Sequence, residues 1–127
     1  MSDMGIFRTT IAIENPLRRG VLRQIADVVV DTGSEYTWVP RDILESLSIA
    51  SERSVRFVAA DGRVIERDIA FANVYAGGSS APDIVVFAGP DDPVLLGARA
   101  LEGMNLRVDL LKRKLVPAGP LPAAVAA

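Results

Sequence analysis

The residues best suited to chemistry in this chain are a carboxylate and two hydroxyls that directly follow an apolar run. The stretch Asp31-Thr32-Gly33-Ser34 comes immediately after Val28-Val29-Val30. A carboxylate delivered from a buried strand is costly unless it is hydrogen-bonded or paired. Gly33 allows a tight turn and the close approach of another backbone. The pattern indicates a charge that is held in place for use.

The residue types that are missing narrow the chemistry further. The chain has no cysteine and no histidine. Thiolate nucleophiles, serine–histidine triads and the common zinc sites are therefore excluded, and we expect no cofactor and no metal. Hydrolysis would then depend on carboxylates or on the two lysines, Lys112 and Lys114. An isolated aspartate such as Asp31 also has a structural interpretation, as the cap of a turn.

Length and charge point to one small domain without a nucleic-acid partner. The chain has 127 residues, 50% of them hydrophobic, and a net charge of −2. This is enough to bury one core, and it gives no basic face for nucleic acid. No apolar run approaches a membrane span of roughly 18–20 residues. Residues 1–5 lack the basic head and apolar run of a signal peptide, so we expect a cytoplasmic protein without membrane contact.

Short apolar runs separated by prolines and glycines predict an all-β domain. Two short helices are expected. The first covers residues 41–47, after Pro40, and the second covers residues 98–102, after Leu95-Leu96-Gly97, and is closed by Gly103. Residues 77–80 are expected to form a loop. The predicted strands cover residues 9–14, 21–30, 36–39, 55–60, 63–70, 83–88, 94–97, 106–110 and 115–116. In this pattern Arg18-Arg19 is a solvated hairpin connection and Asp61-Gly62 is a hairpin turn.

The ordered motifs resemble the aspartic peptidases. Residues 28–34 are similar to their active-site loop, which reads apolar-apolar-Asp-Thr/Ser-Gly-Ser/Ala. Leu95-Leu96-Gly97, followed by a short helix, resembles a second family signature whose glycine packs across the catalytic loop. The similarity extends from about Thr9 to Val116. It implies a small closed barrel-like acid-protease fold with one lobe per chain over residues 1–116, and a tail, 117–127, that is flexible or packed in a dimer.

The resemblance is to the single-domain, retropepsin-like branch, because the chain has one Asp-Thr-Gly where pepsin-like chains have two such loops. The reaction needs two carboxylates that share a proton, so the second must come from another copy of the chain. The resemblance therefore implies a homodimeric endopeptidase with Asp31, Thr32 and Gly33 as catalytic residues. Thr32 is expected to bond across the dimer, and Ser34 to donate a hydrogen bond to the carboxylate.

The same resemblance implies a substrate-binding region formed by the catalytic loop and a flap. Ser34 and Glu35 would supply the loop side, and Ala60, Asp61 and Gly62 the tip of a hairpin that closes over a peptide or protein substrate. The tip has a single glycine, whereas retroviral flaps are glycine-rich.

Other interpretations stay open at this point. Glu35 is equally well read as a surface charge, and Asp61-Gly62 as an ordinary exposed hairpin. Asp91-Asp92 lies between prolines and is read as a solvated turn in preference to a metal site. A catalytically idle dimer serving as a binding or scaffold module, or an unrelated β-barrel binding protein, would also fit the fold class.

Overall fold

The fold is described by a computed structural model for residues 6–125. Residues 1–5, considered above for a targeting signal, and residues 126–127 of the expected tail lie outside this description. In chain order the elements are β1 (Arg8–Glu14), β2 (Leu22–Val30), β3 (Thr37–Pro40), α1 (Arg41–Ser46), β4 (Arg53–Val58), β5 (Val64–Ala76), β6 (Ser79–Ala88), β7 (Leu95–Leu96), α2 (Ala98–Met104), β8 (Leu106–Asp109) and β9 (Lys114–Pro117).

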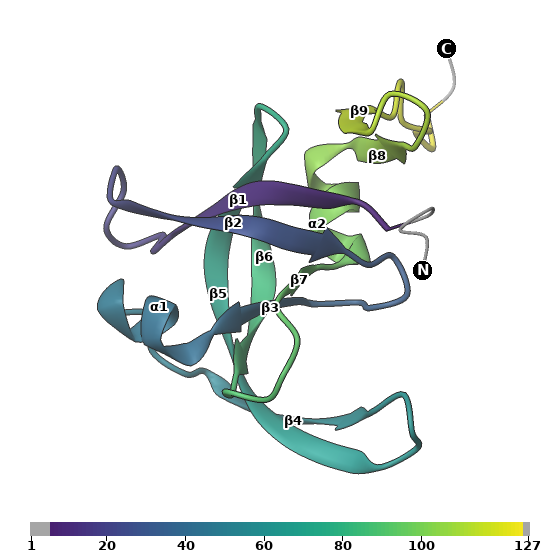
Figure 1. The fold of residues 1–127 in the computed structure, drawn as a ribbon. Helices are drawn as coiled ribbons and strands as arrows, with labels where there is room; N and C mark the ends of the chain where they lie inside the picture. The colour runs from purple at the N-terminus through teal and green to yellow at the C-terminus, as the bar shows by residue number, and fades with distance from the viewer. Residues whose placement is uncertain (1–5, 126–127) are drawn as a thin grey trace.

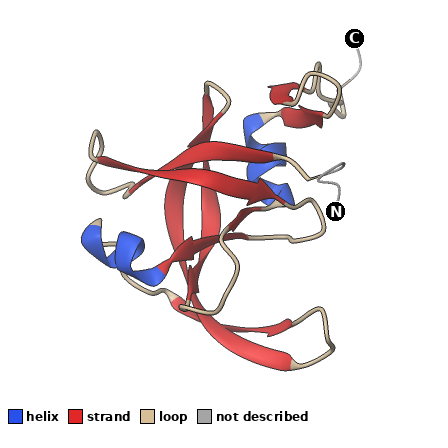
Figure 2. Ribbon diagram, viewed as in Figure 1, coloured by secondary structure: helices blue, strands red, loops and turns tan. Residues whose placement is uncertain are grey.

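Six of the strands close into a ring. They pair in the order β1-β2-β7-β3-β6-β5, and β1 also pairs with β5. β4 is attached outside the ring to β5, with which it forms a hairpin that projects from the body of the molecule (Figure 1). β8 and β9 form a separate two-stranded sheet, and the two short helices lie at the margins of the strands (Figure 2). The prediction of a small all-β fold with one or two short helices is confirmed.

Several predicted boundaries differ from the structure by a few residues, and two of these errors occur beside glycines. The second helix was expected to close at Gly103, but α2 continues to Met104. Asn105 then takes the left-handed conformation (φ 54°) that ends it. The loop expected at 77–80 is only a turn, because Gly77 and Gly78 both have positive φ, and β6 begins at Ser79.

A β-bulge in β2 sets the direction of its last three residues. Thr9 pairs with Val28 and Ile11 pairs with Ile25, so two residues of β2 oppose the single residue between Thr9 and Ile11. The second of these, Asp27, has a left-handed φ of 56°. The extra residue shifts the inward-facing positions by one. Val28 is therefore buried, while the two valines that follow it, expected to be buried on both faces, are only half-buried.

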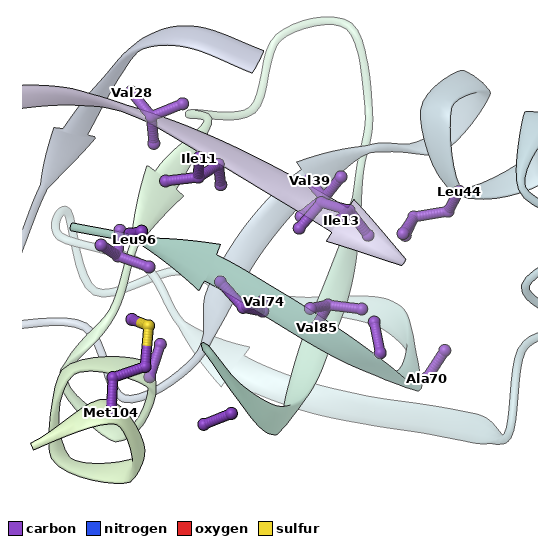
Figure 3. Packing of buried hydrophobic residues seen from close by; sticks show 14 of the residues in the cluster. Ile11, Ile13, Val28, Val39, Leu44, Ala70, Val74, Val85, Leu96 and Met104 are labelled. Carbon is purple, nitrogen blue, oxygen red and sulfur yellow. The ribbon is translucent and has the colours of Figure 1, made fainter. Parts of the chain in front are cut away.

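The ring encloses one apolar core. Leu44 of α1 closes one end of this core and Met104 of α2 lies at the other (Figure 3). Between them lie side chains from all six strands of the ring, among them Ile11, Val28, Val39, Val74, Val85 and Leu96. Full burial of each such side chain stabilises the fold by about 1.5–3 kcal/mol.

The C-terminal hairpin fixes the start of the tail. The Ala118 N–H donates to the Asn105 carbonyl (2.9 Å), and the Asn105 side-chain amide donates to the Gly119 carbonyl (2.8 Å). The beginning of the segment expected to be flexible or dimer-packed is thus bonded to the end of α2. None of the helices within residues 6–125 has the length and apolarity needed to cross a membrane.

A buried carboxylate stabilises the opposite end of the ring. Glu14 is only 2% exposed. Its oxygens accept hydrogen bonds from the Gly20 N–H (2.7 Å), the Asn73 amide (2.9 Å) and the Tyr75 hydroxyl (2.8 Å). Arg19, expected to be merely solvated, lies 3.1 Å from the same carboxylate. These contacts, with the Gly20 bond as the largest, lower the pKa of Glu14 to about 2 from 4.5.

Glu14 should make the fold sensitive to acid. Because the pKa of Glu14 is lower in the folded state, its ionised form stabilises that state above about pH 4.5, and this contribution is lost as the pH falls towards 2. Glu14→Gln should therefore lower the midpoint of thermal unfolding at neutral pH and reduce its decline between about pH 5 and 2.5. Circular dichroism melts measure both. The exposed Glu66→Gln is the control, and equal declines in wild type and Glu14→Gln would contradict the assignment.

Candidate active site

Asp31 is the first residue after β2 and sits in a tight, bonded turn. Its N–H donates to the Leu96 carbonyl (2.9 Å), and its own carbonyl accepts from the Ser34 N–H (3.2 Å). The Gly33 N–H donates to the Asp31 Oδ1 atom (2.9 Å). The backbone is therefore fixed and the carboxylate is oriented, yet Asp31, Thr32 and Gly33 are all exposed. This combination leaves a positioned carboxylate open to a reactant.

A single peptide group holds this loop to β3. The carbonyl of the Leu96–Gly97 peptide accepts from the Asp31 N–H (2.9 Å), and its N–H donates to the Thr37 hydroxyl oxygen (3.0 Å). Thr37 is completely buried. Both polar atoms of one peptide are thus satisfied, one by the start of the catalytic loop and one by the strand that follows it.

Gly97 lies directly against the backbone of the loop. A Cβ atom at this position would be 2.5 Å from the Tyr36 carbonyl oxygen and 2.9 Å from that of Glu35. The first residues of α2 continue the contact, since the Ala98 N–H donates to the Ser34 carbonyl (2.8 Å) and the Arg99 N–H to the Glu35 carbonyl (3.1 Å). The packing of this glycine across the loop, which the family resemblance implied, is present in the structure.

Ser34 does not have the hydrogen bond predicted for it. Its hydroxyl donates to the Tyr36 carbonyl (3.0 Å), not to the Asp31 carboxylate. The serine closes a local turn of the loop, and the donor to the carboxylate is the backbone N–H of Gly33. Side chains of serine often make such short-range bonds to nearby backbone.

The predicted hairpin is present and projects beside the loop. The Ala59 N–H donates to the Arg63 carbonyl (2.8 Å), and the Gly62 N–H to the Ala59 carbonyl (2.9 Å). Gly62 has a φ of +89°, a conformation that glycine adopts without strain. In Figure 1 the hairpin tip and the loop after β2 lie on the same side of the molecule.

A cleft of about 320 Å³ separates this hairpin from the catalytic loop. It brings together three of the predicted substrate-binding residues, Ser34, Glu35 and Ala60, with Gly33, which is predicted to be catalytic. Asp61 and Gly62 form the turn beyond the cleft and do not line it. The Asp61 carboxylate instead accepts from the backbone N–H and the side chain of Arg63 (3.0 and 2.7 Å), and these bonds lower its pKa.

The other walls of the cleft are apolar residues that the sequence analysis did not assign to the site. They are Tyr36, Trp38, Phe57 and Val58. The Phe57 ring meets Tyr36 edge-on, with centroids 5.9 Å apart, and lies 5.3 Å from Trp38. The alternation of Val55 and Phe57 in β4 was a usable signal, because it places both side chains on one face of the hairpin.

The acidic pair at the end of the ring has a structural role. Asp92 accepts two hydrogen bonds from the Arg67 guanidinium (2.6 and 2.8 Å) and one from the Gly89 N–H (2.7 Å). The interpretation of Asp91-Asp92 as a simply solvated turn is therefore wrong for the second residue, although Asp91 is exposed. The ion pair joins the loop before β7 to strand β5 of the hairpin.

Replacement of Gly97 tests the packing between the glycine and the loop. Gly97→Ala should reduce the free energy of unfolding by about 1–3 kcal/mol, because the new methyl group would overlap backbone atoms that have no room to move. Urea denaturation measures the change. In the control, Gly89→Ala, the added Cβ would lie 3.3 Å from an Asp92 carboxylate oxygen, so a smaller effect is expected. Equal stability of wild type and Gly97→Ala would disprove the contact.

Comparison with known proteins identifies the family to which this site belongs. A family model described as Aspartyl protease matches residues 20–100, which include the Asp31 loop, the β4–β5 hairpin and Gly97. No curated protein matches the chain. The resemblance to aspartic peptidases is confirmed, since the match covers more than half of the sequence. The chain belongs to the aspartyl protease family.

Proposed function

We propose that this chain is an aspartic endopeptidase that acts as a homodimer, with Asp31 and its symmetry mate as the catalytic pair. The supporting observation is the state of Asp31 itself. Its backbone is bonded to Leu96 and its carboxylate to the Gly33 N–H, yet the side chain is exposed beside a cleft. A carboxylate that only capped a turn would not need the additional hydrogen bond between the Asp31 N–H and the Leu96 carbonyl of β7.

The dimer follows from the number of carboxylates that the reaction needs. The sequence contains one Asp-Thr-Gly and no Asp-Ser-Gly. A two-fold axis beside the loop would bring two copies of Asp31 together, and each copy would bring the same surroundings. Thr32, exposed in the single chain, is then the residue proposed to bond across the axis.

The proposed reaction is direct attack by water. One Asp31 is ionised and removes a proton from a water molecule held between the pair, and the water oxygen bonds to the peptide carbonyl carbon. The other Asp31 is protonated and donates to the carbonyl oxygen. The proton taken from the water is then passed to the peptide nitrogen and the C–N bond breaks. One hydroxyl of the resulting diol returns its proton to the second Asp31, and a carboxylic acid and an amine are released. No covalent intermediate with the enzyme is formed.

The cleft suggests which part of a substrate is recognised. Its rings, Tyr36, Trp38 and Phe57, offer an apolar surface for one side chain of an extended peptide or unfolded protein. Glu35 lies at the same cleft and is the charged group available to a polar neighbour in the substrate. We propose that β4 and β5 act as a flap over this peptide, with Ala60 at the contact edge.

The rival proposal is a catalytically idle dimer of the same fold. The observation that favours it is the hairpin tip, where Asp61 and Arg63 pair with each other and a single glycine provides the turn. Such a tip has fewer flexible residues to close over a peptide. Activity measurements decide between the two proposals.

Mixing wild-type and Asp31→Asn chains tests whether the site is shared. The amide cannot act as the base, so the pure variant should be inactive while its fold and its dimer are retained. When equal amounts of the two chains are unfolded and refolded together, about half of the wild-type chains should pair with a variant chain. These mixed dimers should be inactive, so the activity per wild-type chain should fall to about half. The rate of cleavage of an unfolded protein measures this loss, and sedimentation measures the dimer.

An exposed aspartate provides the control for this experiment. Asp91→Asn chains should mix without any loss, because Asp91 is an exposed residue of the loop between β6 and β7 and not part of the Asp31 loop. Full activity per wild-type chain in the Asp31→Asn mixture, or a monomer that cleaves, would overturn the shared site. A dimer that cleaves nothing would favour the idle scaffold.

The rate should be bell-shaped with pH. Activity requires one proton on the pair, so it should fall both when the pair gains a second proton and when it loses the first. Cleavage of a peptide library from about pH 3 to 8 measures the profile, with circular dichroism at each pH to separate unfolding from inactivation. Ser34→Ala should leave the optimum in place, since its hydroxyl bonds Tyr36 instead of the carboxylate. A rate that rises steadily into alkali would contradict the mechanism.

A further inference from the structure

Unlike the exposed Asp31, one aspartate of β6, the strand that pairs with β3, is buried. Asp83, on β6, has a side chain that is 3% exposed, and its Oδ2 atom has no hydrogen-bond partner. It is the one buried side-chain oxygen or nitrogen within residues 6–125 that lacks a partner. The nearest cation is Arg99, whose Nε atom is 4.0 Å from Oδ1 and whose side chain is half exposed. A buried carboxylate with so little compensation requires a reason.

Thr37, on the neighbouring strand β3, has a hydroxyl proton for which the structure shows no acceptor among residues 6–125. Its hydroxyl oxygen already accepts the Gly97 N–H, so the hydroxyl proton remains to be donated. Thr37 is fully buried, and a buried donor without an acceptor is destabilising. β3 and β6 are paired side by side, with Thr37 opposite Val85, two residues from Asp83. The Thr37 side chain is also among the groups that favour the ionised form of Asp83.

We propose that Asp83 is a positioning residue for the catalytic loop: it accepts the Thr37 hydroxyl proton and so fixes the Leu96–Gly97 peptide that holds Asp31. The order of the chain is Asp83, Thr37, the peptide, and then the Asp31 backbone. The two contacts that follow Thr37 in this order are present in the structure. The Gly97 N–H donates to the Thr37 hydroxyl oxygen (3.0 Å), and the Leu96 carbonyl accepts from the Asp31 N–H (2.9 Å). Asp83 does not line the cleft and touches no substrate in this scheme.

The groups around Asp83 shift its pKa in opposite directions, and burial has the largest effect. Burial raises the pKa of Asp83, and the Glu35 carboxylate raises it further. The Ile84 N–H, the Arg99 charge and the Thr37 hydroxyl act in the opposite direction. Removing the side chain would eliminate a costly buried charge but would leave the Thr37 proton without an acceptor. An asparagine would keep an acceptor oxygen without the charge.

Hydrogen exchange of the Asp31 amide tests this proposal directly. Asp83→Ala should exchange that amide roughly tenfold faster than wild type, because the chain of bonds behind it loses its end. Asp83→Asn should restore the wild-type rate. Thr37→Val should match Asp83→Ala, and the double variant should show no further increase. Asp91→Ala, at an exposed aspartate, is the control and should leave the rate unchanged.

The catalytic readout rests on the proposed function, whereas the exchange readout does not. In an active enzyme Asp83→Ala should lower kcat roughly tenfold with little change in KM, and Asp83→Asn should recover it. Should the alanine variant fail to fold, Asp83→Leu fills the same space without an acceptor and gives the same comparison. Unchanged exchange in that variant, or additive effects of Asp83 and Thr37, would overturn the proposal. A wild type that lacks activity but shows the predicted exchange pattern would refute only the peptidase.

Discussion

The Leu96–Gly97 peptide is the constraint on which the candidate site depends. Its carbonyl fixes the first residue of the catalytic loop and its N–H fixes the strand after that loop. Only a glycine can bring this peptide so close, since any side chain at position 97 would overlap the carbonyls of the loop. Without this contact, the exposed carboxylate would be attached to a turn with no fixed direction.

The cleft and the core share residues, so recognition and stability are linked. Trp38 belongs to a second apolar cluster with Leu95, against which Phe57 packs. The same two rings line the cleft. A substitution that changes the shape of this wall therefore also changes the packing of β7, the strand that precedes Gly97. The ion pair of Arg67 with Asp92 attaches the loop before β7 to the hairpin from the other side.

Local patterns were enough to predict much of the fold and the centre of the site. The Asp31 loop, the turn at Gly62 and the short helix after Pro40 follow rules that act within a few residues, and each is present. The closure of β1 onto β5 was implied by family resemblance and could not be read from short segments.

Features that depend on contacts distant in sequence were missed or misread. The Ser34 hydroxyl bonds the Tyr36 carbonyl in a loop whose shape depends on its contacts with Gly97 and Ala98, which are distant in sequence. The burial of Glu14 depends on Asn73 and Tyr75, about sixty positions away. Asp83 reads as an ordinary strand aspartate until β3 and β6 are paired. The homodimer and the catalytic and substrate-binding roles of the site residues stay predictions.

The bulge in β2 divides that strand into two halves that can change independently. Before the bulge β2 pairs with residues 11–14 of β1. After it, Val28 and Val29 pair with Thr9 and Arg8, and Val29 and Val30 pair with β7. When residues are added to or removed from the β1–β2 hairpin, the bulge can move along β2 and take up the change in length. The orientation of Asp31 then does not depend on the length of the hairpin at the other end of β2. The hairpin can accordingly be lengthened or shortened while the Asp31 carboxylate keeps its orientation. It is therefore a place where new loops could be introduced by engineering.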